Sequence, residues 1–352
     1  MMMRGARSTA SWIGSAAACG LAAIGAAGCG AGSRPASAAT PTTPVVSTTT
    51  VTMTTTTTTT TTDTVTLPGA GKPPVTIGDE NLPEQFLLGQ LYYQALKAQG
   101  FQVTLNQNIG PPQVVMQALA TGQLAMYPEY LDTWDQQVAG IQQQFATRSS
   151  AYLAGQRYAV NQGLQLLDPT PFSDTNAIAV PFYYAVTNGV QSIPDLIKVS
   201  PQLTLGGPPQ FQQSSTGLPW LESTYGVTPA TFKPLEIGAQ YQALDNGTVQ
   251  AAVVNTTDPQ LLSGSYPLLH DPQDMFGWGN VVPVASARAL AAEGPVFEAT
   301  INRVSALLTL DAMRELNAQV VLFNQDPATV AQQFLQAQGI LATPVPSGTS
   351  TG

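Results

Sequence analysis

Three aromatic side chains lie close together in the stretch AMYPEYLDTW, residues 125–134, in a chain of which only 7% of the residues are aromatic. Tyr127, Tyr130 and Trp134 surround a Pro-Glu pair there. Such a group could form an aromatic wall that faces a ligand, or it could pack into a hydrophobic core at the start of a helix. The choice between a binding site and a core depends on the elements that position these rings.

The residue groups that could catalyse a reaction do not predict an enzyme. The stretch GTSTG, residues 348–352, has the spacing of a nucleophile elbow but ends the sequence without the strand and helix that the elbow needs. His270 beside Asp271 could act as a base, yet no nucleophile lies nearby. Asp79 and Glu80 precede a predicted helix, which favours capping over acid–base chemistry. One histidine and two cysteines cannot supply a metal-ligand cluster. We therefore expect no catalysis, no cofactor and no metal.

Composition limits the class of protein. The 352 residues are 43% hydrophobic and only 9% charged, which is enough for two medium-sized domains. The formal net charge is −9, and no basic patch appears, so the sequence does not predict nucleic-acid binding.

The N-terminus has the pattern of a signal peptide over residues 1–28. Arg4 and Arg7 precede a small-residue apolar stretch, residues 12–27, and AAGC ends at Cys29. Small residues directly before a cysteine resemble a bacterial lipobox, in which the cysteine is lipidated. We expect Cys29 to anchor the protein to the cell membrane, on its extracytoplasmic face, with simple secretion as the alternative.

Two segments have the composition of disordered chain. After Cys29, the sequence to residue 74 is rich in Thr, Ser and Pro, with Thr54–Thr62 unbroken. Such sequence buries too little apolar area to offset the entropy of ordering, so residues 29–74 are predicted to be a tether. Residues 342–352 are predicted to be a loose tail for the same reason.

Strand patterns alternate with helical patterns from residue 75 onward. VTIG (75–78), FQVTL (101–105) and LAMY (124–127) have the apolar content of short strands. Residues 82–99 and 111–120 lie between them and have helical patterns. This alternation is typical of an α/β fold with a parallel sheet.

The aromatic stretch follows directly on the third strand. Ligands of such sheets bind at the carboxyl ends of strands, where helices begin. Tyr127 ends the strand, and Pro128 and Glu129 suit the first turn of a helix. Tyr130 therefore lies at the mouth of the predicted crevice, which favours a role in binding. For Trp134, four residues on, a core position and a binding position remain equally open.

Several longer motifs resemble one family. VTIGDENLPEQFLLGQL (75–91) and ALATGQLAMYPEYLDTW (118–134) are similar to the osmoprotectant (glycine betaine/choline/carnitine) binding proteins of ABC importers. The resemblance extends over about residues 75–340. It continues through DTNAIAV (174–180), SIPDLIK (192–198), YQALDNGTVQAAVVNTTD (241–258), MRELNAQV (313–320) and DPATVAQQFLQAQG (326–339).

The resemblance implies an α/β, two-lobed type II periplasmic-binding-protein fold. Lobe one would comprise residues 75–177 and 284–341, and lobe two residues 178–283. Two crossovers would form a hinge, and a solute would be clamped between the lobes. The implied partners are an ABC permease in the membrane and its cytoplasmic ATPase, with the binding protein itself a monomer.

The family holds quaternary ammonium ligands in a box of tyrosines through cation–π contacts. By resemblance, the first box tyrosine matches Tyr130, and a threonine beside it matches Thr133. At the three other ring positions this chain has Asn176, Asn255 and Gly279. The chain therefore keeps one ring of four.

Two more residues complete the predicted site. Trp278, next to Gly279, could supply a ring, and Glu80, near the start of the first helix, would repel a ligand carboxylate. The predicted ligand-binding residues are Glu80, Tyr130, Thr133, Asn176, Asn255 and Trp278.

Loss of three rings changes the expected ligand. Each ring contributes about 1–2 kcal/mol to binding a desolvated cation, so we expect weak or no binding of glycine betaine. The two asparagine amides favour a neutral, hydroxyl-rich ligand that stacks on Tyr130 or Trp278, or failing that a cation without a carboxylate. The alternative is that Trp278, Tyr183 or Tyr184 completes the box and glycine betaine still binds.

The predicted function is solute capture for an osmoprotectant-type ABC importer. A binding lipoprotein that senses or scavenges a hydroxyl-rich or aromatic ligand is the alternative within the same fold. An exported hydrolase is the less favoured alternative from another class.

Overall fold

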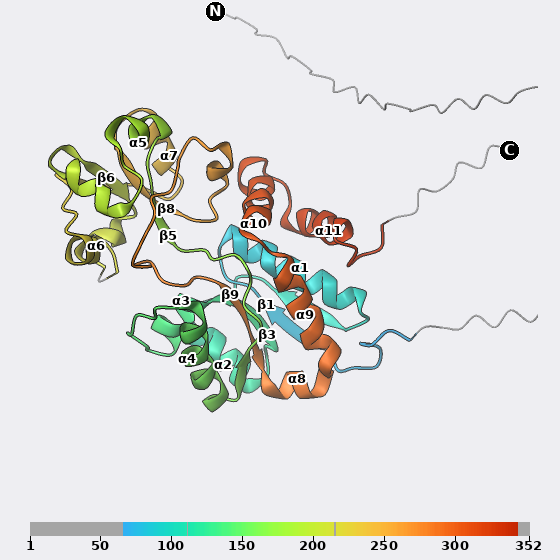
Figure 1. The fold of residues 1–352 in the computed structure, drawn as a ribbon. Coiled ribbons are helices and arrows are strands. Elements are labelled where there is room, and N and C mark those ends of the chain that lie inside the picture. Colours follow the sequence, from blue (N-terminus) through green and yellow to red (C-terminus); the bar gives the residue numbers. More distant parts are fainter. Residues whose placement is uncertain (1–65, 111, 215, 344–352) are drawn as a thin grey trace, which may run out of the picture. The chain divides into compact units, whose positions relative to one another are not determined.

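The computed structural model describes residues 66–110, 112–214 and 216–343, and these residues contain two β-sheets (Figure 1). Both sheets belong to one compact unit. The predicted signal peptide, Cys29 and most of the predicted tether lie outside the described residues. Within the described residues, no helix is long and apolar enough to cross a membrane.

The first sheet has the strand order β2-β1-β3-β9-β4. β1 is parallel to β2 and to β3, whereas β9 is antiparallel to both β3 and β4. The expected parallel pairing holds for β1, β2 and β3. It does not extend to β9, which enters from the second sheet by a crossover and not through a strand-helix-strand unit. The strands are β1 (Val75–Gly78), β2 (Val103–Asn106), β3 (Met126–Tyr130), β4 (Leu164–Leu166) and β9 (Val281–Ser286).

Helices cover the first sheet and bury its apolar side chains. In α1, Leu87, Leu88 and Leu91 are spaced so that one face of the helix is buried, and α1 packs against α9 and α11 (Figure 1). Tyr92 of α1 shares a 2.9 Å hydrogen bond with Ser305 of α9 inside this core. The helices are α1 (Pro83–Ala98), α2 (Pro112–Thr121), α3 (Leu131–Thr133), the π-helix η1 (Trp134–Val138), α4 (Arg148–Asn161), α8 (Ala287–Glu293), α9 (Pro295–Leu307), α10 (Leu310–Asn317), the π-helix η6 (Ala318–Leu322) and α11 (Pro327–Ala337).

The second sheet has the strand order β5-β8-β6-β7, with β5 antiparallel to β8 and the remaining pairs parallel. Leu205 and Val253 lie in its buried core. The strands are β5 (Asn176–Ala179), β6 (Thr204–Gly207), β7 (Thr231–Pro234) and β8 (Ala251–Asn255). The helices are α5 (Phe182–Asn188), α6 (Leu218–Tyr225), α7 (Gln240–Asp245) and the 3-10 helices η2 (Ile193–Lys198), η3 (Ser200–Gln202), η4 (Pro209–Gln212) and η5 (Pro259–Ser263).

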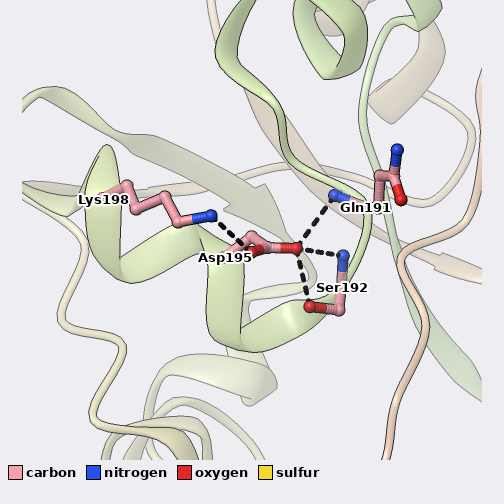
Figure 2. Close-up of polar contacts among 4 residues, drawn as sticks. All are labelled: Gln191, Ser192, Asp195 and Lys198. Carbon is pink, nitrogen blue, oxygen red and sulfur yellow. Dashed lines mark hydrogen bonds and ion pairs between the residues drawn. The ribbon is translucent and has the colours of Figure 1, made fainter.

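The motif SIPDLIK forms the short 3-10 helix η2, whose start Asp195 stabilises (Figure 2). One carboxylate oxygen accepts hydrogen bonds from the backbone N–H of Gln191 and from both the N–H and the hydroxyl of Ser192. The other oxygen forms an ion pair with Lys198, with Nζ and Oδ1 2.6 Å apart. These donors hold the pKa of Asp195 well below its usual value, the Lys198 contact contributing most.

The two crossovers between the sheets lie side by side. Ser173 and Asn280 form an isolated antiparallel bridge, and the N–H of Asp174 donates to the carbonyl of Gly279 at 2.9 Å. A Cβ at Gly279 would lie 1.8 Å from the oxygen of Asp174, so this close approach requires glycine. This contact explains why no ring occupies a position where the resemblance leads one to expect a tyrosine.

The sheet boundaries differ slightly from the expected lobe boundaries. β5 joins the second sheet from Asn176, and β9 joins the first sheet from Val281. Residues 66–74, expected in the tether, are described as a turn and an approach to β1, with the N–H of Gly69 donating to the carbonyl of Gln99 at 2.8 Å. The hydrogen bond fixes this segment to the end of α1.

Candidate functional site

An aromatic-walled cavity of about 110 Å³ lies among elements connected to both sheets. η1 and the loop after it come from the first-sheet part of the chain, whereas α6 and the start of β5 come from the second-sheet part. The segment that returns to β9 supplies the remaining wall. The lining residues are Asp132, Asp135, Gln136, Ile141, Gln143, Gln144, Phe145, Ala151, Asn176, Thr216, Trp220, Asp274, Met275, Phe276, Gly277 and Trp278.

Four aromatic rings line this cavity, together with the smaller apolar side chains of Ile141, Ala151 and Met275. Trp278 lies in the crossover, and its indole N–H donates to the carbonyl of Phe145 at 2.9 Å. This bond fixes the ring relative to the loop before α4. Trp220 lies on α6, and Phe276 lies two residues before Trp278. Two tryptophans and two phenylalanines can therefore contact one small molecule from different elements.

Two carboxylates lie beside these rings. Asp132 and Asp135 are three residues apart on the helical turns that follow β3, a spacing that puts them on one face. Oδ1 of Asp132 accepts the backbone N–H of Thr133 at 2.8 Å. Oδ1 of Asp135 is buried with no hydrogen-bond partner among the described residues. It lies against Gly155 of α4, where an added Cβ would come within 2.5 Å of it.

Burial changes how these carboxylates titrate. Desolvation raises the pKa of Asp132 to about 6, against the opposing effect of its backbone hydrogen bond. Desolvation also raises the pKa of Asp135 to about 7, and the nearby charge of Asp132 adds to this effect. Near neutral pH, the pair can therefore change its charge when a ligand binds.

The structure brings three of the predicted site residues to one place. Asn176 and Trp278 both line the cavity. Asn255 lies directly opposite Asn176 in the antiparallel pairing of β5 and β8, and both side chains are exposed. Thr133 is half-buried and adjoins Asp132.

Tyr130 lies elsewhere, in the hydrophobic core of the first sheet, and is only 8% exposed. Its hydroxyl donates to Oε1 of Glu84 at 2.9 Å. Oε2 of the same carboxylate accepts from Asn317 of α10 at 2.7 Å, and Asn317 also donates to the carbonyl of Thr257 at 3.2 Å. Burial raises the pKa of Glu84. This network links β3, α1 and α10 to the segment after β8.

The other two rings of the aromatic stretch 125–134, Tyr127 and Trp134, are also buried. Trp134 is fully buried, packs edge-on against Tyr158 and donates from its indole to the carbonyl of Gly155, so the open choice for Trp134 resolves to the core. The hydroxyl of Tyr127 donates to Glu129 at 3.2 Å. Burial raises the pKa of Glu129, and the charge of Glu80 adds to it, which places Glu80 near this buried carboxylate.

The sequence interpretation missed most of the cavity wall. Asp132 and Asp135 had a usable signal, because Asp132 lies within the aromatic stretch 125–134 and Asp135 follows it at helical spacing. Trp220, Phe145 and Phe276 had none, since each lies in a different element and only the tertiary fold brings them together.

Asp271, the carboxylate next to His270 in the sequence, has a structural role. Asp271 accepts the hydroxyl of Tyr225 and also the backbone N–H of Phe276. These bonds fix the segment that leads into the crossover.

The expectation that Asp79 and Glu80 cap a helix is not met by Asp79, whose Oδ1 accepts the N–H of Asn108 at 3.0 Å.

Comparisons of the sequence with a family model and with known proteins agree on one family. Residues 73–337 match the model described as the substrate binding domain of ABC-type glycine betaine transport system. A glycine-betaine-binding protein of Pseudomonas aeruginosa is 28% identical over 276 residues, covering 75% of this chain and 88% of that protein. The glycine betaine-binding protein YehZ of Escherichia coli is 25% identical over 293 residues, covering 78% of this chain and 94% of that protein.

Solved structures agree on the fold. A crystal structure described as a glycine betaine/carnitine/choline ABC transporter superposes with a TM-score of 0.70 at 23% identity, covering 76% of this chain and 99% of that one. Apo YehZ superposes with a TM-score of 0.65 at 25% identity, covering 76% of this chain and 99% of that one. The predicted α/β periplasmic-binding-protein fold is confirmed, and it is built on two sheets.

Proposed function

The chain belongs to the family of substrate-binding domains of ABC-type glycine betaine transport systems, and we propose that its solute binds in the cavity between Trp220 and Trp278. The protein is the binding component of an osmoprotectant importer and not an enzyme. One observation decides the choice of site: the four aromatic side chains that line the cavity come from segments connected to both sheets. A solute held there contacts both parts of the chain at once, as clamping requires.

The rings suit the trimethylammonium groups of glycine betaine, carnitine and choline, the solutes that the descriptions of related proteins name. Tryptophan faces attract cations more strongly than other rings do, at about 0.5–2 kcal/mol each. The box tyrosines that the resemblance leads one to expect at Asn176 and Asn255 are absent. We infer that Trp220 and Trp278 take their place from neighbouring elements.

A hydroxyl-rich solute is the second candidate, and the amides at the cavity favour it. Gln136, Gln143 and Gln144 line both this cavity and an adjoining one of about 550 Å³. Amide side chains both donate and accept hydrogen bonds, which suits hydroxyl groups. Of the predicted binding residues, Asn176 and Trp278 line this cavity. Glu80, Tyr130, Thr133 and Asn255 are outside its lining and stay predictions from the sequence alone.

Membrane attachment through Cys29 completes the proposal. A lipid anchor followed by a Thr-rich tether would keep the binding domain near an ABC permease in the membrane, which would pass the solute on with the help of its cytoplasmic ATPase. The support is the AAGC pattern after an apolar run.

Calorimetry with a panel of betaines, choline, amino acids and polyols tests the proposed site. Trp278→Ala and Trp220→Ala should each weaken binding of the solute that the unaltered protein binds, by about tenfold or more. Phe323→Ala, which removes a 63% exposed ring elsewhere, is the matched control and should leave affinity unchanged. Unchanged affinity in both tryptophan variants would overturn the choice of cavity.

A further inference from the structure

We propose that Asp132 and Asp135 make this cavity selective for organic cations that lack a carboxylate, so that choline binds in preference to the zwitterion glycine betaine. The inference rests on the proposed function, since it concerns the charge of the solute in the same cavity. It names two specificity-determining residues that lie outside the ring positions of the family resemblance.

The first support is an unpaired buried carboxylate. Asp135 is only 4% exposed and lines the cavity, yet its Oδ1 has no partner among the described residues. Carboxylates this buried are nearly always paired with a cation or fully hydrogen-bonded, because an uncompensated charge is costly to desolvate. A cation bound in the cavity beside Asp135 would offset the charge of this carboxylate.

The second support is the charge of the whole wall. Three lining residues are aspartates, namely Asp132, Asp135 and Asp274, and none of the lining residues is a lysine or an arginine. A ligand carboxylate placed here would face like charges with no basic side chain to pair with it. A positively charged head group between the tryptophans would instead be attracted by the rings and by the carboxylates together.

The third support comes from how the pair is built. Gly155 of α4 leaves room for the Asp135 carboxylate, since a Cβ there would come within 2.5 Å of Oδ1. Asp132 has one oxygen held by the N–H of Thr133. The fold therefore positions two carboxylates beside the rings without using them to pair with other side chains.

Proton release gives a readout that a merely structural role would not produce. Burial raises the pKa of Asp135 to about 7, so part of the empty protein carries a proton on this group at neutral pH. A bound cation favours the carboxylate form, and the proton then passes to the buffer. Calorimetry of choline binding at pH 7 in buffers of different ionisation enthalpy measures this release.

The deciding experiment is calorimetry of the purified protein with choline and with glycine betaine at pH 7. Choline should bind at least about tenfold more tightly than glycine betaine, with release of a fraction of a proton. Asp135→Asn and Asp132→Asn should each reduce choline affinity by about tenfold, leave glycine betaine affinity equal or higher, and reduce the proton release. Glu236→Gln makes the same charge change at an exposed position away from the cavity and should alter nothing.

The comparison of the two solutes needs no variant, so it stands even if one substitution prevents folding. Tighter binding of glycine betaine than of choline would overturn the proposal, as would an unchanged ratio of affinities in both aspartate variants. A polyol that binds through Trp278 while neither trimethylammonium solute binds would overturn the charge selectivity and leave the proposed function standing. Solute affinity that is unchanged in both Trp220→Ala and Trp278→Ala would overturn the proposed function itself.

Discussion

Asn176 and Asn255 lie directly opposite each other at the ends of the antiparallel strands β5 and β8. The resemblance leads one to expect a tyrosine at each of these positions, and the structure shows that the two replacements adjoin. Asn176 also lines the aromatic cavity. One pair of exposed amides, on the second-sheet side, therefore stands where two rings are expected.

Asn176→Ala should weaken solute binding by about three- to tenfold, because a hydrogen bond in a cavity contributes about 0.5–1.5 kcal/mol. Asn255→Ala should have a smaller effect, since Asn255 faces Asn176 and is not among the residues that line the cavity. Calorimetry with the best solute of the panel measures both. A larger loss in Asn255→Ala than in Asn176→Ala would show that the solute contacts β8 directly.

Tyr130→Phe should lower the free energy of unfolding by about 1–2 kcal/mol. The variant keeps the buried ring and removes only the hydroxyl that donates to Glu84 at 2.9 Å, which leaves one buried carboxylate oxygen without a donor. Urea unfolding measures the change. Tyr183→Phe, at a 63% exposed tyrosine, is the control and should be neutral, and an equal effect of the two variants would contradict the role of the network.

The protein should lose stability as the pH rises from about 4 to 7. Burial raises the pKa of Asp79 to about 7, so the folded form keeps a proton that the unfolded chain has already lost. The free energy of unfolding therefore falls as the pH rises through this window. Above about pH 7, Asp79 makes no further contribution to the pH dependence. Between pH 5 and pH 8 the loss from Asp79 is about 2–3 kcal/mol.

Asp79→Asn tests this assignment, because the amide cannot ionise. Urea unfolding at pH 5 and at pH 8 should show a smaller difference for the variant than for the unaltered protein. The difference should not vanish, since burial also raises the pKa of Glu84 and Glu129. Glu236→Gln should keep the full difference, and an Asp79→Asn variant with the same pH dependence as the unaltered protein would assign the titration to other groups.

Cys29→Ala should release the protein from the membrane fraction into the medium. Cys29 follows the small residues that typically precede a lipidated cysteine, and without its thiol no lipid can be attached. Fractionation of cells with an antibody against the binding domain measures the distribution. Cys19→Ala is the matched control and should stay in the membrane fraction; a Cys29→Ala protein that also stays there would indicate an uncleaved anchor.

Local patterns predicted the architecture because each strand and helix carries its own periodicity. Residues 82–99 were expected to be helical, and α1 spans Pro83–Ala98. The direction of β9 could not be predicted in this way, because it depends on a crossover from the other sheet and not on local sequence.

The candidate site was harder to predict for the same reason. An aromatic residue directly after a strand has the same sequence pattern whether its side chain faces a crevice or a core. In the structure, the hydroxyl of Tyr130 donates to Glu84, 46 positions earlier in the sequence. Trp278 could be anticipated because it adjoins a position marked by the family resemblance. Trp220 is brought to the cavity only by the packing of α6, which no short motif records.

The placement of the tryptophans gives the cavity its own optical reporter. Of the three tryptophans in the described part of the chain, Trp134 is shielded in the core, whereas Trp220 and Trp278 line the cavity. Intrinsic fluorescence of the unlabelled protein should therefore shift when a solute displaces water from these two rings. Trp220→Phe and Trp278→Phe would assign the signal to each wall, so that solutes can be titrated and closing rates followed by stopped flow without an attached dye.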